Sequence, residues 1–186
     1  MKLMGMSAVA LAMALSACGG GGSSNAPSAC GAGLGAHTLS GTVSAVHDGD
    51  TLTLIHSTGS EQIRLQGIDA PELAQAWGTS SQLALQSLVH HQPVTVVFDQ
   101  RDRYGRLLGH VFSTGCDHIN LRLLREGMAW YYRAYACDLP ASLRTPFNQA
   151  ESTAQQQQQG LWRQASPVAP WIFRNGEDAP EPVCTN

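Results

Sequence analysis

Hydrophobic and polar residues alternate along residues 39–56, and the alternation breaks once, at the His-Asp-Gly-Asp segment of residues 47–50. A period of two is typical of strands with one buried face, and Asp-Gly is a strong hairpin-turn signal. Residues 61–70 continue the same pattern as a third strand. The first part of the chain is therefore expected to form a meander of three strands.

The pattern changes after the third strand. Apolar residues recur at helical spacing between residues 79 and 90, which predicts the first helix. Two runs rich in Val, Leu and Phe follow, at residues 93–99 and 106–112, and each has the composition of a strand.

The last part of the chain is expected to be mostly helical. A short helix is predicted over residues 120–127, with Asn120 as its N-cap and Gly127 as its C-terminal stop. Residues 129–135 are expected to be extended, and residues 141–160 to form the final helix.

This order of elements favours one fold class. Five strands, with a helix inserted after the third, fit an α+β fold built on a five-stranded OB-fold Greek-key barrel with about three helices. Propensity by itself does not separate this barrel from other α+β folds. We assign the domain to residues 37–165 and expect the Pro-rich tail, residues 166–186, to be irregular.

The N-terminus has the features of an export signal. One lysine precedes a short apolar run and then small residues, so residues 1–17 are predicted to be a signal peptide. Cys18 follows those small residues as in a bacterial lipobox, and we expect it to carry lipid. Ordinary cleavage beside an incidental cysteine is the alternative.

Lipidation would make the protein a membrane-anchored lipoprotein of the bacterial envelope, with residues 18–36 as a flexible linker. Gly19 stands where an Asp commonly signals retention at the inner membrane, so the outer membrane is favoured. We expect a monomer.

The charge balance argues against a protein that binds nucleic acid through bulk charge. Lys2 is the single lysine, so the exported part has ten arginines against 14 Asp and Glu, a net side-chain charge of about −4 with neutral histidines. An anionic ligand must therefore be bound by a local group of arginines.

Four cysteines remain besides Cys18, and an even count in an exported chain suggests two disulfides. Three pairings are possible, and we favour Cys116–Cys137 with Cys30–Cys184. Free thiols are the alternative. A metal-thiolate site is less favoured still, because no Cys-x-x-Cys motif or close Cys-His pair is present.

Oxygen donors gather where two predicted strands meet turns. Asp50 ends the Asp-Gly-Asp turn, Asp69 ends the third strand, and the Ala70 carbonyl precedes Pro71, which has no amide donor. A hard cation such as Ca²⁺ binds carboxylates and backbone carbonyls, so these groups are candidate ligands, although Asp-Gly-Asp alone is also an ordinary turn.

Arginines and a further carboxylate lie near these candidate ligands. Arg64 falls on the polar face of the third strand, and Arg106 follows a glycine turn ahead of the fifth. A guanidinium can bind two phosphate oxygens at once, although surface salt bridges are the simpler explanation for each arginine. Glu72 could activate a water molecule, or could be a carboxylate at a helix start.

Several separate motifs carry a resemblance to a known family. The segments VHDGDTLTL, IRLQGIDAPE and DRYGRLLGHVF, followed by NLRLLREGMAWYY and QGLW, resemble the staphylococcal nuclease family in the same order and with comparable spacing. The resemblance covers about residues 43–162. It implies an OB-fold, calcium-dependent phosphodiesterase that cuts DNA and RNA to 3′-phosphorylated products.

The resemblance also implies roles for particular residues. It implies calcium ligands (Asp50, Asp69 and the Ala70 carbonyl), catalytic groups (Arg64, Arg106 and Glu72) and nucleotide-contacting aromatics (Tyr104 and Tyr135). This chain departs from the family prototype in three ways. Ala70 replaces a threonine, Arg133 replaces a tyrosine, and the lysine-rich nucleotide loop has no counterpart.

Two other functions compete with the nuclease. One is a non-catalytic OB-fold lipoprotein that binds nucleic acid or oligosaccharide, and the other is a purely structural envelope lipoprotein. A binding module would tolerate loss of Glu72 or Asp50, and a structural protein would need no arginine on the strand face. Loss of an activity on addition of a chelator would distinguish the nuclease from both.

Overall fold

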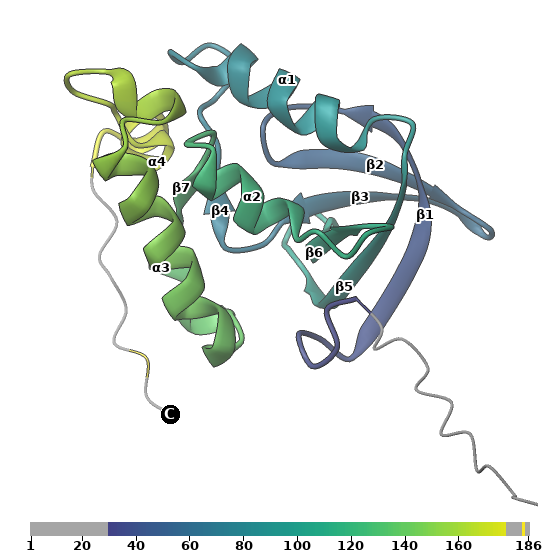
Figure 1. The fold of residues 1–186 in the computed structure, drawn as a ribbon. Helices are drawn as coiled ribbons and strands as arrows, with labels where there is room; N and C mark the ends of the chain where they lie inside the picture. The colour runs from purple at the N-terminus through teal and green to yellow at the C-terminus, as the bar shows by residue number, and fades with distance from the viewer. Residues whose placement is uncertain (1–29, 178–183, 185–186) are drawn as a thin grey trace, which may run out of the picture.

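The computed structural model describes residues 30–177 and residue 184 (Figure 1). Its strands are β1 (His37–Val46), β2 (Thr51–His56), β3 (Gly59–Leu65), β4 (Ile68–Asp69), β5 (Pro93–Arg101), β6 (Leu107–Ser113) and β7 (Trp130–Tyr131). Its helices are α1 (Gly78–Val89), α2 (Ile119–Arg125), α3 (Ala141–Gln156) and α4 (Pro170–Asn175), with 3₁₀ turns η1 (Arg133–Asp138) and η2 (Gly160–Arg163).

Five strands close into a barrel in the order β1-β2-β3-β6-β5. The long strand β1 pairs with both β2 and β5, and its register shifts between Val43 and Ala45. The barrel closes through the parallel pair β3 and β6, whereas its other pairs are antiparallel. The structure therefore confirms the predicted α+β fold on a five-stranded barrel of the OB type.

The core follows the alternation seen in the sequence. In β3, Ile63 and Leu65 are fully buried, whereas Gln62 is exposed and Arg64 is mostly covered. Apolar residues from the barrel pack with others from α1, α2 and α3 in one continuous cluster. Figure 1 shows α1 across one end of the barrel and α2 and α3 on one side of it, where β4 and β7 also pair.

Three local predictions were wrong. Residues 129–135 form only the two-residue strand β7 before the chain turns into η1. Asn120 is not an N-cap. It lies inside α2 with its side chain buried, where Oδ1 accepts from the Val111 amide at 3.0 Å and Nδ2 donates to two barrel carbonyls. The tail was expected to be irregular, yet residues 170–175 form α4, with Pro170 in its first turn.

The predicted disulfide pairing was also wrong. The bonds are Cys30–Cys116, with Cα atoms 5.2 Å apart, and Cys137–Cys184, at 5.1 Å. The segment before β1 crosses the β5–β6 pair, because a Cβ at Gly31 would touch Phe112 and Val97. This crossing places Cys30 beside the loop after β6 that carries Cys116.

The predictions for residues 1–29, including the signal peptide and lipidation of Cys18, lie outside the described residues. Within the described part of the chain, no helix is both long enough and apolar enough to cross a membrane.

Candidate active site

Backbone pairing brings the predicted carboxylates next to Arg64. Thr51, the first residue of β2, pairs with Arg64 in β3, so Asp50 lies beside the β3 strand. Asp69 ends β4 and bonds to Arg64 across five positions of sequence. Gly67, with a left-handed φ of 78°, lets the chain reverse between β3 and β4.

The turn before β2 packs tightly against the end of β4. At Gly49 a Cβ atom would lie 2.5 Å from the Ala70 side chain and 2.7 Å from Ser81, so the close approach requires glycine. The approach lets the Ala70 amide donate to Asp50 Oδ2 at 2.7 Å, and the Asp50 amide in turn donates to Asp48 Oδ1 at 2.9 Å. Asp50 is thereby fixed from both sides.

The Arg64 side chain is only 14% exposed and is held by several buried acceptors. Its Nη1 donates to the carbonyls of Leu65 at 3.0 Å and Ile68 at 2.9 Å. The same nitrogen lies 3.1 Å from Asp50 Oδ2, and Nη2 lies 2.8 Å from Asp69 Oδ1. Arg64 therefore links the two strand-end carboxylates that the sequence singled out.

Burial has the largest effect on the pKa values of both carboxylates. It raises the pKa of Asp50 to about 8, although the adjacent Arg64 charge opposes this shift. Burial also raises the pKa of Asp69, against the opposing effects of Arg64 and Arg174. Two carboxyl groups whose pKa values are raised by burial, with an arginine between them, mark this cluster as a candidate functional site.

The donor set fits a hard divalent cation. The cluster contains four carboxylates and two guanidiniums, so its formal charge is about −2 when all are ionised. The carboxylates are Asp48, Asp50, Asp69 and Glu72, and the guanidiniums are Arg64 and Arg174. Among the described residues, no group of three His, Cys, Asp or Glu side chains is placed so that it could hold a metal ion. A calcium site here would therefore need a backbone ligand, the Ala70 carbonyl, in addition to Asp50 and Asp69.

Sequence reasoning missed one member of this cluster, Arg174 in α4. Its Nη2 lies 2.8 Å from Asp69 Oδ2, and its Nη1 lies 2.6 Å from Glu72 Oε1. The structure therefore brings Glu72 beside Asp69, as the motif spacing suggested, with an arginine between them. The single signal that could have indicated α4 is the apolar Pro-Trp-Ile-Phe stretch in a tail that otherwise lacks pattern.

Arg106 is placed by the turn before β6 and not by the carboxylate cluster. Its guanidinium pairs with Asp102 at 2.7 Å and lies 5.5 Å from the Tyr104 ring centroid. In the parallel β3–β6 pair, Leu107 is opposite Ile63. Side chains alternate along a strand, so Arg106 is on the same face of the barrel as Arg64.

The two candidate substrate aromatics are both exposed, Tyr104 beside Arg106 and Tyr135 in η1. Tyr135 packs edge-on against Tyr132 at 4.9 Å between ring centroids. Arg133, which stands where the family prototype has a tyrosine, pairs with the fully buried Glu151 at 2.6 Å. That arginine has a structural role in joining η1 to α3.

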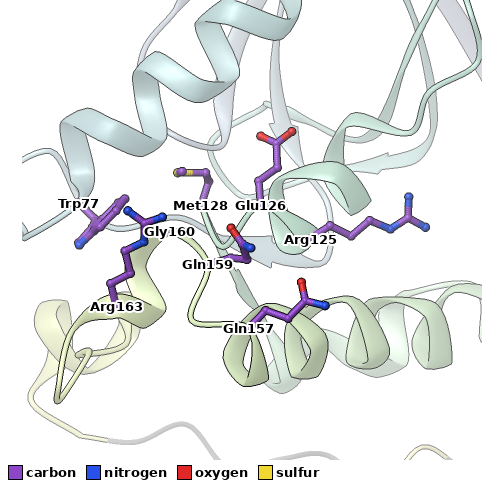
Figure 2. A pocket seen from close by; sticks show the side chains of 8 residues that line it. All are labelled: Trp77, Arg125, Glu126, Met128, Gln157, Gln159, Gly160 and Arg163. Carbon is purple, nitrogen blue, oxygen red and sulfur yellow. The ribbon is translucent and has the colours of Figure 1, made fainter.

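A concave pocket of about 590 Å³ lies elsewhere and contains none of the predicted site residues (Figure 2). It is formed where the ends of α1, α2 and α3 meet, and its lining includes Trp77, Arg125, Met128, Gln159 and Arg163. The carboxylate and arginine cluster, in which Asp50 and Asp69 are buried, is thus separate from this pocket.

Comparisons with known proteins show which family the chain resembles. The family described as staphylococcal nuclease homologue matches residues 62–164. A protein of Escherichia coli O157:H7 named an uncharacterized endonuclease is 42% identical over 139 residues, covering 74% of this chain and 86% of the relative.

Two further relatives have similar coverage. A micrococcal nuclease of Shigella flexneri is 35% identical over 142 residues, covering 72% of this chain and 79% of the relative. An uncharacterized endonuclease of Haemophilus influenzae is 39% identical over 133 residues, covering 71% of each. The family match spans more than half of the chain, and these relatives are matched over most of their length. The chain belongs to the staphylococcal nuclease family.

Proposed function

We propose that this protein is a calcium-dependent nuclease that hydrolyses phosphodiester bonds of DNA and RNA and leaves 3′-phosphorylated products. The observation that carries the proposal is the junction of Asp50 and Asp69 through Arg64, with Glu72 beside Asp69. Carboxylates, a guanidinium and a candidate base in one cluster are the groups that phosphodiester hydrolysis requires.

Different residues of the chain would bind the metal ion, bind the phosphate and hold the carboxylates in place. Ca²⁺, when bound by Asp50, Asp69 and the Ala70 carbonyl, would supply positive charge beside a non-bridging phosphate oxygen. Arg106 would bind further phosphate oxygens with its planar fork, and Arg64 would hold the two carboxylates in place while adding positive charge.

Glu72 would accept a proton from the attacking water. Its side chain is about one third exposed, so water reaches it directly. Its backbone amide donates to Gln75 Oε1 at 3.2 Å, which fixes the start of the loop that carries it. A carboxylate in this position can remove the proton or orient the water for in-line attack.

The test is cleavage of single-stranded DNA and RNA by the purified protein, with calcium or with chelator. We expect calcium-dependent cutting that the Glu72→Gln variant loses. The matched control is Glu61→Gln, which makes the same change at a β3 carboxylate that pairs with Arg101 and lies outside the cluster. Folded protein that binds DNA in the presence of calcium without cutting it would move the assignment to a non-catalytic binding module.

We further propose that the protein acts in the bacterial envelope as a lipoprotein anchored through Cys18. Two disulfides use the other four cysteines, which supports an oxidising compartment and leaves Cys18 for lipid. Incorporation of labelled fatty acid into the wild-type chain, and its loss in Cys18→Ser, would test the anchor.

A further inference from the structure

A positive charge from the chain itself occupies the carboxylate cluster. The guanidinium of Arg174 spans two acidic residues: Nη1 donates to Glu72 Oε1 at 2.6 Å, and Nη2 donates to Asp69 Oδ2 at 2.8 Å. A longer contact of 3.3 Å joins Nη1 to Asp69 Oδ1. Arg174 therefore bridges a candidate metal ligand and the candidate base.

The helix that carries Arg174 is docked and not a loose tail. Trp171, one turn earlier in α4, stacks on Tyr132 at 5.3 Å with ring planes 5° apart, and it packs edge-on against Trp130. The chain before α4 is held where Gln75 Nε2 donates to the Val168 carbonyl at 2.6 Å. These contacts fix α4 beside β7, as Figure 1 shows.

The far side of α4 is also restrained. The Cys137–Cys184 disulfide joins the end of the chain to η1, the turn that follows β7. Arg174 thus belongs to a segment fixed on both sides of α4, which keeps its effective concentration at the carboxylates high.

Both oxygens of Asp69 are taken by guanidiniums. Oδ1 accepts from Arg64 at 2.8 Å, and Oδ2 accepts from Arg174 at 2.8 Å. A cation that takes Asp69 as a ligand would share an oxygen with a guanidinium and lie directly beside it. Arg64 is fixed by two backbone carbonyls and is mostly buried, whereas the Arg174 side chain is 34% exposed.

Electrostatic repulsion also indicates that Arg174 is the arginine that a bound cation would displace. A divalent cation at Asp69 and the Arg174 guanidinium would repel each other at short range, and the side chain of Asp69 is only 1% exposed, so solvent screens its surroundings weakly. Metal binding at Asp69 and the contacts of Arg174 with Asp69 should therefore oppose each other.

We propose that Arg174 is a built-in competitor of the metal ion, so that α4 is an autoinhibitory segment of the cation site. The inference rests on the proposed function, because it needs Asp69 and Glu72 to face a metal. Calcium must release Arg174 from Asp69 before the site can form, and the apparent calcium affinity of the protein is lowered accordingly.

The experiment measures calcium binding by titration calorimetry, with both disulfides formed, in wild type, Arg174→Gln and Arg163→Gln. Arg163 is exposed on η2, and its substitution makes the same change in net charge as that of Arg174. We expect Arg174→Gln to bind calcium at least about fivefold more tightly than wild type, the scale of a partly exposed ion pair, and Arg163→Gln to match wild type.

Two outcomes separate the inference from the proposed function. If all three proteins bind calcium with equal affinity, or Arg174→Gln binds it more weakly, the competition is refuted while the calcium site stands. If none of them binds calcium, the proposed calcium site fails and the competition fails with it.

A second measurement uses wild type alone and so does not depend on the folding of a variant. Release of Arg174 should change the surroundings of α4, so the amide resonances of residues 171–175 should shift as calcium is added. A spectrum in which these resonances stay fixed at saturating calcium would refute the release of α4.

Discussion

Arg64 of β3 and Asp69 of β4 form a 2.8 Å ion pair across five positions of sequence. A two-residue turn that includes Gly67, with its left-handed φ of 78°, separates the two strands and brings Asp69 to the arginine. Asp50 joins the pair at 3.1 Å from the turn before β2. One arginine thus holds a carboxylate from that turn and a carboxylate from the end of β4 in one buried cluster.

Removal of Arg64 should destabilise the metal-free protein. Arg64→Ala leaves Asp50 and Asp69 buried without their shared partner, and breaking a buried ion pair costs about 3 kcal/mol or more. Urea unfolding in the presence of chelator should show this loss. Arg101→Ala is the control, because Arg101 pairs with Glu61 at the surface, where an ion pair contributes about 1 kcal/mol or less. Equal effects of the two substitutions would contradict the proposed role of Arg64.

Two buried histidines, His110 in β6 and His118 before α2, should each lower the stability of the protein in acid. Neither ring nitrogen of His110 has a hydrogen-bond partner within the described structure, and the same holds for Nε2 of His118. Burial lowers the pKa of His110 to about 4 and that of His118 to about 3, below the ordinary value of 6.5. Below pH 6.5 these two histidines bind more protons in the unfolded chain than in the folded one, so their contribution to stability falls as pH drops toward 4. Asp50 and Asp69, whose pKa values burial raises, contribute in the opposite direction over the same range.

Each histidine should contribute about 1.4 kcal/mol of lost stability per pH unit in this window. The slope of the free energy of unfolding against pH, measured in urea between pH 7 and pH 4.5, should be less positive for His118→Leu than for wild type, because this substitution removes one of the two histidine contributions and leaves Asp50 and Asp69 in place. Since His118 stacks on Phe112 at 4.6 Å, an apolar replacement keeps the packing. A slope unchanged by this substitution would show that the acid sensitivity lies in other groups.

The disulfide at the end of the chain should control access to α4. The double variant Cys137→Ser/Cys184→Ser lacks the disulfide that ties the chain after Arg174 to η1, so local opening of α4 becomes easier. Trypsin should then cleave after Arg174 at least about fivefold faster than in wild type. Cys30→Ser/Cys116→Ser removes the other disulfide and should leave this cleavage rate unchanged. Cleavage that is equally fast in both double variants would mean that the disulfide does not hold α4.

The barrel could be predicted from the sequence because its signals are local. The alternation of Ile63 and Leu65 with polar neighbours sets the buried face of β3, and the motif spacing places Asp50 and Asp69 at strand ends. Arg174 and the disulfide pairing could not be predicted in this way. Both depend on where segments far apart in sequence dock, such as Trp171 on Tyr132, and no periodic pattern records such contacts.

Arg106 provides the sharpest test of the proposed chemistry. It directly precedes β6, the strand parallel to β3, and lies on the same face as Arg64. Its guanidinium is held by Asp102 through both Nε and Nη2 at 2.7 Å. Arg106→Lys keeps the positive charge but loses the planar fork that binds two phosphate oxygens. The rate constant kcat for DNA cleavage should fall by about 100-fold, the scale of one lost transition-state donor.

The matched control for Arg106 is Arg103→Lys, in the same turn. The Arg103 guanidinium lies 4.8 Å from the Tyr104 ring centroid, so it shares the ring with Arg106 but takes no part in the proposed phosphate contact. Its substitution should leave kcat within about threefold of wild type, because a lysine can keep a contact with the ring. If Arg106→Lys also stays within about threefold, a point charge suffices at this position and the bidentate role of Arg106 is refuted.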